Sequence, residues 1–405
     1  MRSRIILVGA FVLVHVWLAI INLYLSPGGM TDVYGVYFRW MQDGFTQGIW
    51  AGIDTPWVYP VVALVPMALA YLPGAGFFPE SWLVLVTLLD LAALLVVIRR
   101  TPAAGWAWTA FLLALGPIAI GRIDTITVPL VIIALVVLSR HPIVAGVLLA
   151  VATWIKVWPA VVIAAVLVAA RQRWRVLLAV VSASAVIVLV GLALGAGDHL
   201  ASFVSSQTAR GLQIEAPVTT PWMWAAFAGD GEVYFDHDII TWQVTGDGVD
   251  LASQLMNPLL AIGVVAALVL GLIAQRRGAH PTRVLILLAL ALVASLIVFN
   301  KVGSPQYYTW FAAPVVLMYV SGDARSYRMP VVMIGAIAVL TQFIYPYLYF
   351  LVVDLNPVLL AMLTVRNLLV VGVLVWAVAA LVQGARQGRR RALGVQTYDE
   401  SFGRP

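Results

Sequence analysis

Long apolar runs recur from the first residues almost to the C-terminal end, and they constrain the fold of this chain more than any other feature. Each run approaches the roughly 20 residues that a helix needs to cross the hydrocarbon core of a bilayer. Candidate spans lie near residues 1–26, 82–98, 104–120, 124–139, 142–170, 176–196, 255–274, 284–299, 308–320, 329–350 and 358–384. Only 10% of the residues are charged, against about 25% in an ordinary soluble domain. These features exclude a water-soluble fold and predict an all-α polytopic membrane protein.

Two segments complicate the count of spans. Residues 142–170 must form two pieces, because Pro159 lacks the backbone donor that a continuing helix requires. Residues 58–72 contain two prolines and form the weakest candidate span. Counting them gives thirteen spans, which would put the basic C-terminal tail outside, whereas basic residues tend to stay in the cytoplasm. We therefore predict about 12 transmembrane helices, with 58–72 re-entrant or partly at the surface. The predicted domains are one transmembrane domain, 1–384, and a basic cytoplasmic tail, 385–405.

The charges are distributed unevenly along the chain. Short basic clusters at 99–100, 171–175, 276–277 and 389–391 separate the apolar runs. Residues 197–253 hold eight acids and one base, a formal charge of −7. Because the whole chain has a net charge of +6, the other residues together carry +13. Because basic residues near span ends are retained inside, we predict a multi-pass protein of the cytoplasmic membrane with loops 27–57 and 197–254 outside. The basic pI thus needs no nucleic-acid partner, and the lack of cysteine excludes a thiolate nucleophile or metal site.

Four cations occupy unusual places, at the predicted outer ends of helices. They are Lys156, Lys301, Arg122 and Arg366, and the first two are the only lysines in the chain. A cation at this boundary is costly unless it is paired, and the phosphate of a lipid is its natural partner. The alternative is that these cations snorkel, or pair with Asp124 and Asp354. Four cations at one face favour an anionic binding site.

The first predicted outer loop carries the candidate catalytic acid. Residues 28–40 read GGMTDVYGVYFRW, a Gly-rich turn followed by Asp32 and an aromatic stretch. A carboxylate held just outside the bilayer can accept a proton from a hydroxyl nucleophile. Asp is also a preferred N-cap, so Asp32 could simply cap the next helix. Asp43 and Asp54 share the loop and are weaker candidates, the first in a solvated stretch and the second in a turn before Thr-Pro.

Two polar strings stand out in the long acidic loop. Residues 207–215, QTARGLQIE, offer Arg210, Gln213 and Glu215 as groups that could hold sugar hydroxyls, although a salt-bridged interfacial helix would explain the same residues. Asp236 and Asp238 have an Asp-x-Asp spacing that can bind a divalent cation between phosphates. Because two carboxylates alone do not define a site, we favour a solvated acidic loop and predict no metal ligands.

Residues 300–310, NKVGSPQYYTW, form the most informative string in the sequence. Lys301 supplies a cation, and the Gly-Ser-Pro turn lets the backbone approach a ligand. The further substrate-binding candidates in this string are Ser304, Gln306, Tyr307 and Trp310. The sequence has no phosphate-binding GxxxxGK[ST] loop, HExxH or GxSxG motif, so nucleotide hydrolysis, zinc proteolysis and serine hydrolase chemistry lack their usual supports.

Taken together, four elements resemble a known family of enzymes. They are Asp32 before an aromatic helix, the WIKVWP break at 154–159, the RGLQ string at 210–213 and the KVGSPQY string at 301–307. The chain is similar in these to the actinobacterial polyprenyl-phosphate-mannose-dependent α-1,2-mannosyltransferases of the GT-C superfamily. The resemblance covers most of the membrane domain, with the Ser-Pro-Gln-Tyr string its most specific part.

This resemblance implies an inverting transfer of mannose from polyprenyl-phosphate-mannose to a mannose-containing lipid, outside the cytoplasmic membrane. Asp32 would be the catalytic base, and Lys301, Lys156, Arg122 and Arg366 would bind the donor phosphate. Such donors need no nucleotide, so the resemblance implies an enzyme without a cofactor or metal. Both phosphatidylinositol mannosides and lipomannan remain open as acceptors. A transporter or flippase for a lipid-linked sugar is the alternative, since it would also show broken helices and intramembrane polar residues such as Asp90.

Overall fold

The computed structural model describes residues 2–208, 211–237 and 239–392. The helices are α1 (Arg2–Ile20), α2 (Phe38–Gln47), α3 (Leu64–Tyr71), α4 (Phe78–Ile98), α5 (Pro102–Leu115), α6 (Asp124–Val137), α7 (Pro142–Ile155), α8 (Pro159–Ala169), α9 (Arg173–Ala193), α10 (Ser202–Thr208), α11 (Thr220–Ala228), α12 (Val249–Arg276), α13 (Pro281–Val298), α14 (Ala312–Val320), α15 (Arg328–Gln342), α16 (Tyr349–Val353) and α17 (Pro357–Ala392). Strands β1 (Glu232–Asp236) and β2 (Thr241–Thr245) form an antiparallel hairpin with Glu232 opposite Thr245.

Eight helical segments in the described part of the chain are long and apolar enough to cross a membrane. These are Ser3–Leu25, Ala75–Ile98, Pro102–Ala119, Arg173–Ala193, Val249–Arg276, Pro281–Val298, Ala324–Tyr347 and Pro357–Gly388. Shorter apolar helices occupy Val61–Tyr71, Asp124–Val137, Pro142–Ile155 and Pro159–Ala169. The prediction of an all-α polytopic membrane protein is therefore confirmed. The count of about 12 spans and the domain limits stay predictions, and α17 carries the helix eight residues past the predicted start of the tail.

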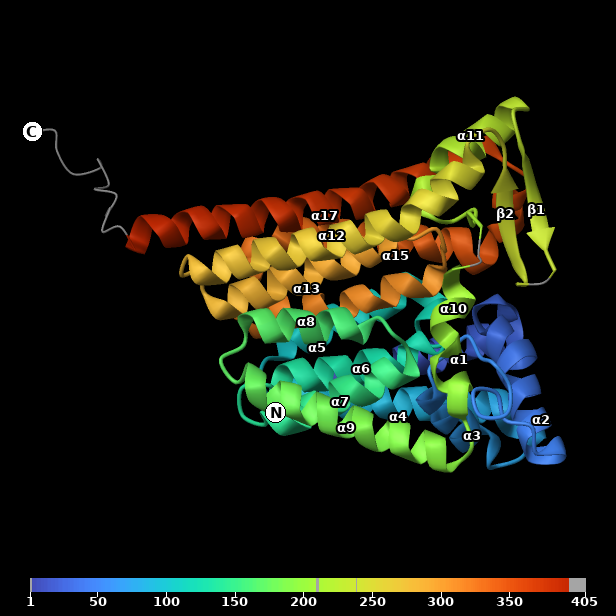
Figure 1. Ribbon diagram of the computed structural model, residues 1–405, viewed down its shortest axis with the longest axis horizontal. Coiled ribbons are helices and arrows are strands. Elements are labelled where there is room, and N and C mark those ends of the chain that lie inside the picture. Colours follow the sequence, from blue (N-terminus) through green and yellow to red (C-terminus); the bar gives the residue numbers. More distant parts are fainter. Residues whose placement is uncertain (1, 209–210, 238, 393–405) are drawn as a thin grey trace, which may run out of the picture.

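The helices run side by side, and the connections that differ most in charge gather at opposite ends of the bundle (Figure 1). One end carries α2, α10, α11 and the β1–β2 hairpin, and we call it the loop end. At the other end lie the C-terminal end of α17 and the α8–α9 and α12–α13 connections, which contain Arg171 and Arg277. We call this the arginine end. The bundle thus separates the long acidic loop from the basic clusters along its axis.

Burial differs between helices in the way a membrane bundle requires. Helix α13 packs against α8, α12, α14 and α17, and its residues from Val284 to Ser295 are buried. By contrast, α9 and α12 expose large apolar side chains such as Leu189 and Ile262. Hydrocarbon is as good a neighbour for these side chains as a protein interior, so their exposure fits a lipid-facing surface.

The break predicted within residues 142–170 is confirmed. Helix α7 ends at Ile155, Pro159 is the first residue of α8, and Lys156 lies between them. The extended backbone of Lys156 (φ −151°, ψ 138°) ends α7, and proline at the first helical position starts α8 without losing an intrahelical hydrogen bond. A lysine is thereby placed at the loop end between two apolar helices.

Candidate active site

Asp32 lies at the start of a π-helical turn, Asp32–Tyr37, that leads into α2 at the loop end. Its carboxylate forms an ion pair with Arg122 through Oδ1 and Nη1, and its side chain is 31% exposed. The Tyr37 hydroxyl donates to its second oxygen, Oδ2, at 3.5 Å. The alternative that Asp32 merely caps a helix is wrong, because Thr31 occupies the cap position and the Asp32 carboxylate reaches Arg122 instead.

Arg122 holds the first loop against the connection between α5 and α6. Its Nη2 donates to Thr31 Oγ1 at 2.8 Å and also to the hydroxyl of Tyr345. The backbones touch here, since a Cβ on Gly121 would meet the carbonyl oxygen of Gly29. Burial on its own would lower the pKa of Arg122, but Asp32, Tyr345 and Tyr37 together outweigh it and raise the pKa, so the guanidinium stays charged.

Lys156 and Asp124 form the second ion pair. Lys156 Nζ lies 3.5 Å from Asp124 Oδ2 and 4.5 Å from the centre of the Tyr59 ring. Trp310 Nε1 donates to the other oxygen, Asp124 Oδ1, at 2.7 Å. Burial would lower the pKa of Lys156, but Asp124 and more weakly Asp32 raise it overall. The ammonium group therefore stays protonated over the whole neutral range.

Aromatic rings are stacked beside this pair. Trp158 and Trp310 are nearly parallel with ring centres 5.5 Å apart, and Tyr307 stacks on Trp310 at 4.5 Å. Trp310 belongs to a 3-10 helix, Pro305–Phe311, that precedes α14. In the same string Gln306 is buried and Ser304 is partly exposed. The predicted substrate-binding string is thus attached to the Lys156 pair through its tryptophan.

The third ion pair joins Glu215 to Arg366 of α17. Arg366 Nη1 donates to Glu215 Oε2 at 2.7 Å, and Nη2 donates to the Glu215 carbonyl oxygen at 2.9 Å. Both side chains are buried, and the guanidinium lies 4.8 Å from the centre of the Tyr308 ring. This double contact fixes both the side chain and the backbone of Glu215, and so clamps one stretch of the long loop onto α17.

The stretch of the long loop around Glu215, from Gln213 to Ala216, contacts the segment that carries Lys301. The amide of Gln213 donates to the carbonyl oxygen of Lys301 at 3.0 Å. A Cβ on Gly303 would collide with the backbone nitrogen of Ala216, so this position needs glycine. The Lys301 side chain is 5% exposed, and burial lowers its pKa. The two polar strings of the sequence analysis, 207–215 and 300–310, therefore lie against each other.

We call the six paired residues Asp32, Arg122, Asp124, Lys156, Glu215 and Arg366 the charged cluster. The three pairs are close enough to act on one another. The Asp32 carboxylate raises the pKa of Lys156, and Arg122 opposes the rise that burial causes in the pKa of Glu215. The predicted residues Asp32, Arg122, Lys156, Glu215, Arg366 and Trp310 are thereby brought together, with Gln213, Lys301, Ser304, Gln306 and Tyr307 on the adjoining segments. Arg210 lies outside the described residues.

Sequence reasoning missed several members of this site. It did not select Tyr37, Tyr59 or Tyr345, whose hydroxyls and rings contact the ion pairs. The alternative of pairing with Asp124 and Asp354 is confirmed for Asp124, which pairs with Lys156, and is wrong for Asp354: Arg366 pairs with Glu215, and Asp354 enters no ion pair within the described part of the chain. A tyrosine before a proline in an otherwise apolar span, as at Tyr345, was the available signal.

Asp236, in the hairpin, has structural partners. Asp236 Oδ2 accepts a hydrogen bond from Gln243 Nε2 at 2.7 Å, and Oδ1 accepts one from the Ile239 amide at 3.3 Å. Both bonds stabilise the turn between β1 and β2. Asp238 lies outside the described residues, and among those described no group of three or more His, Asp or Glu could hold a metal ion.

The chemistry available here combines proton transfer with anion binding. A partly exposed carboxylate, Asp32, can accept a proton. Lysine and arginine cations in a water-poor setting stabilise a developing negative charge strongly. Stacked, buried tryptophan and tyrosine rings form a rigid apolar wall beside Lys156. The site can therefore carry out proton transfer next to positive charge.

Comparison with known proteins gives one match. Residues 57–297 match glycosyltransferase family 87, and this region covers more than half of the 405 residues. It includes Arg122, Asp124, Lys156 and Glu215 of the charged cluster, while Asp32 and Arg366 of the cluster, and Lys301, lie beyond its limits. No curated protein and no solved structure matches significantly.

Proposed function

Because the chain belongs to glycosyltransferase family 87, we propose that it transfers mannose from polyprenyl-phosphate-mannose to a mannose-containing lipid. The family and the long apolar helices make the chain a multi-pass membrane glycosyltransferase. Our proposal adds the donor, the acceptor, an α-1,2 linkage formed with inversion, and a site on the outer face of the cytoplasmic membrane. The acceptor is a phosphatidylinositol mannoside or lipomannan. Membership of a glycosyltransferase family argues against the transporter alternative.

The observation that supports this proposal most is the contact between a partly exposed carboxylate and the cations of the charged cluster. In the proposed step, Asp32 takes the proton of an acceptor hydroxyl while the acceptor oxygen bonds to the anomeric carbon of mannose. The bond between that carbon and the phosphate oxygen breaks, and polyprenyl phosphate leaves with the electron pair. Attack from the face opposite to a β-linked phosphate yields the α-linked product.

The contacts of each cation suggest its role in the reaction. Lys301 and Lys156 bind the departing phosphate, where fixed positive charge stabilises the transition state more than the ground state. Arg122 adds positive charge next to Asp32 and orients that carboxylate. Arg366, which is fully buried, acts on the phosphate through the stretch that it clamps. We place the sugars against Arg210, Gln213, Glu215, Ser304, Gln306, Tyr307 and Trp310.

Transfer by the purified protein tests the proposal directly. The full chain in nanodiscs receives synthetic polyprenyl-phosphate-mannose together with either phosphatidylinositol mannosides or short α-1,6-mannosides. We expect an α-1,2-linked product, identified by linkage analysis, and the preferred acceptor chooses between the two candidates. No transfer to either acceptor with donor bound would overturn the proposed substrates. Movement of donor across a sealed vesicle without any transfer would support a transporter instead.

We propose a reaction without a metal or cofactor, and chelation tests this. Asp236 is engaged in the turn of its own hairpin, so its loss should disturb that turn and leave transfer intact. We expect EDTA to change the rate by less than about twofold, because lysine and arginine here supply the charge that a metal supplies in other transferases. A large loss that added Mg²⁺ or Mn²⁺ restores would assign a metal to Asp236 and Asp238.

Donor binding is expected to weaken as the pH rises through the alkaline range, and Lys301 is the cause. Burial lowers its pKa from 10.5, and a lysine is charged only below its pKa, so the charge is lost at a lower pH than in an exposed lysine. Loss of one charged contact should reduce affinity by about tenfold or more. The measurement is the dissociation constant of a non-hydrolysable donor analogue across the alkaline range.

The two lysines of the chain make a matched pair for this test. Lys301→Arg should keep affinity flat at high pH, because guanidinium remains charged there. Lys156→Arg should leave the alkaline decline in place, since Asp124 already holds the pKa of Lys156 high. An alkaline decline that persists unchanged in Lys301→Arg would remove Lys301 from the phosphate site.

A further inference from the structure

A cavity of about 620 Å³ opens at the arginine end, at the opposite end of the bundle from Asp32. It lies between the ends of α4, α6, α8 and α14 and the start of α13. Its volume falls within the roughly 300–1,000 Å³ of pockets that hold small ligands. Glycosyl transfer as proposed above makes no use of it.

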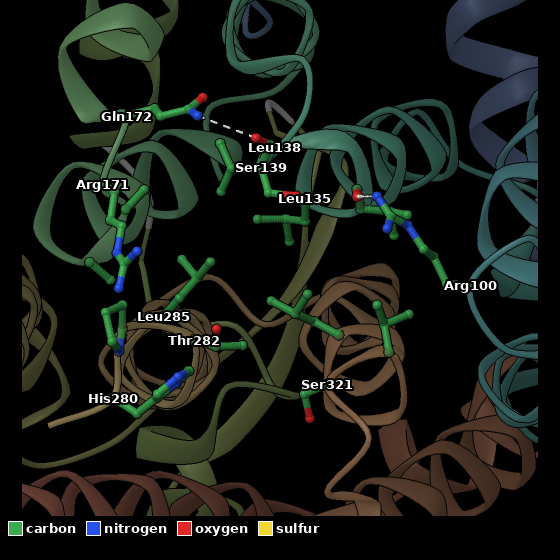
Figure 2. Close-up of a pocket in the computed structure, with 16 residues that line it drawn as sticks. Arg100, Leu135, Leu138, Ser139, Arg171, Gln172, His280, Thr282, Leu285 and Ser321 are labelled. Atoms are coloured by element: carbon green, nitrogen blue, oxygen red, sulfur yellow. Dashed lines mark hydrogen bonds between the residues drawn. The ribbon is translucent and has the colours of Figure 1, made fainter.

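The edge of this cavity is positively charged. Arg171 and the imidazole of His280 lie on one side of it and Arg100 on the other (Figure 2). Arg100 Nη2 donates to the Val136 carbonyl oxygen at 3.2 Å, which holds the guanidinium at the rim. No aspartate or glutamate is among the described residues that line the cavity. The charges at this edge therefore favour an anion.

The interior of the cavity is apolar. Leu135, Leu285 and Leu317 form its wall, and all three belong to helices of the bundle. A second cavity of about 330 Å³ shares His280, Thr282 and Ser321 with it. The larger cavity thus offers a cationic rim above an apolar wall, on a protein with eight helical segments in its described part that are long and apolar enough to cross a bilayer. A free phosphate would use the rim only, whereas a lipid would use both.

We propose that this cavity binds an anionic phospholipid of the leaflet at the arginine end, with the phosphate at the cationic rim that Arg100, Arg171 and His280 form and an acyl chain along the leucine wall. Basic pockets between transmembrane helices bind acidic lipid headgroups through the same combination of charge and hydrocarbon. A bound lipid would join α6, α13 and α14, which meet at this cavity. Because it binds the folded bundle, it would also raise the melting temperature.

Native mass spectrometry of the full chain in a non-ionic detergent tests the proposal. The probes are dioleoyl phosphatidylglycerol, the zwitterionic dioleoyl phosphatidylcholine, and inorganic phosphate as a competitor. The main variant is Arg100→Gln with Arg171→Gln. The matched control is Arg140→Gln, an exposed arginine at the same end that does not line the cavity. Ser321→Trp tests the space, because Ser321 is exposed and borders both cavities.

We expect phosphatidylglycerol to bind at least about tenfold more tightly than phosphatidylcholine, and the double variant to lose that preference. Arg140→Gln should bind like the wild type, Ser321→Trp should bind less, and Arg→Lys replacements at 100 and 171 should restore much of the binding. An equal loss in Arg140→Gln would indicate diffuse surface attraction. Displacement of the lipid by millimolar phosphate would indicate a site for free phosphate. Equal binding of phosphatidylglycerol and phosphatidylcholine would indicate an apolar groove that does not select for anions. Each of these three results overturns the proposal.

Discussion

Asp32→Asn is expected to abolish mannose transfer, with the rate falling by about 10²- to 10⁴-fold, the contribution of a positioned general base. Asparagine keeps the shape of the side chain, and its amide oxygen can still accept a hydrogen bond from Arg122. It cannot take the proton of the acceptor hydroxyl. The expected signature is therefore a loss of turnover in the nanodisc assay with little change in the affinity for a donor analogue.

Asp43→Asn is the matched control for this prediction. Asp43 lies on α2, only 11 residues further along the same loop region, and accepts a hydrogen bond from Gln47. Its substitution should leave turnover within about threefold of the wild type, as expected away from the reacting atoms. If Asp32→Asn lost donor affinity in parallel with turnover, Asp32 would serve to hold Arg122. Turnover retained in Asp32→Asn would place the base elsewhere.

Arg366→Met is expected to destabilise the folded protein by about 3–5 kcal/mol, because it leaves one partner of a buried ion pair uncompensated. Glu215 is 3% exposed, and its burial already raises its pKa against the effect of Arg366. Without Arg366 the ionised carboxylate is the costly form, so the deficit is largest above the pKa of Glu215 and shrinks as the pH falls below it. Melting curves from tryptophan fluorescence at several pH values measure this.

A double variant separates two roles for Arg366. Glu215→Leu with Arg366→Met removes both charges and should recover much of the lost stability, since buried ion pairs are often replaceable by apolar side chains. If donor affinity recovers with stability, Arg366 positions the loop that lies on Lys301. If stability recovers and donor affinity stays lost, the donor contacts Arg366 or Glu215 directly, and Glu215→Gln with Arg366 retained tells which. Arg140→Met, at an exposed arginine, controls for the loss of charge.

Lys156 shows how far local sequence can predict this site. The lysine stands before a proline between two apolar runs, so both the helix break and the position of the cation at a helix end follow from the chain itself. Its pairing with Asp124 was one of two alternatives that the sequence left open, and the structure shows that pair at 3.5 Å. The cation is thus predictable from the sequence and its partner is not.

Arg122 and Arg366 show where sequence reasoning ends. Arg366 reaches Glu215 across 151 residues of chain, and Arg122 reaches Asp32 across 90. Neither ion pair can be predicted from the spacing of residues along the chain. Each depends on how a helix is rotated about its axis and on where along that helix a distant loop makes contact. For Arg122 the deciding contact is between backbones at Gly29 and Gly121.

Composition and charge pattern alone are enough to predict a helical membrane protein with opposite charge at its two ends. The backbone in hydrocarbon must satisfy its own hydrogen bonds, which requires helices. Burying charge there is costly, so charged residues are confined to the segments between long apolar runs, and the sequence shows this pattern directly. The packing of the helices shows which acid faces which cation at the loop end, and that Arg100, Arg171 and His280 surround one cavity at the arginine end. Those pairings depend on contacts between helices distant in sequence, and side-chain contacts of that kind leave no periodic signal.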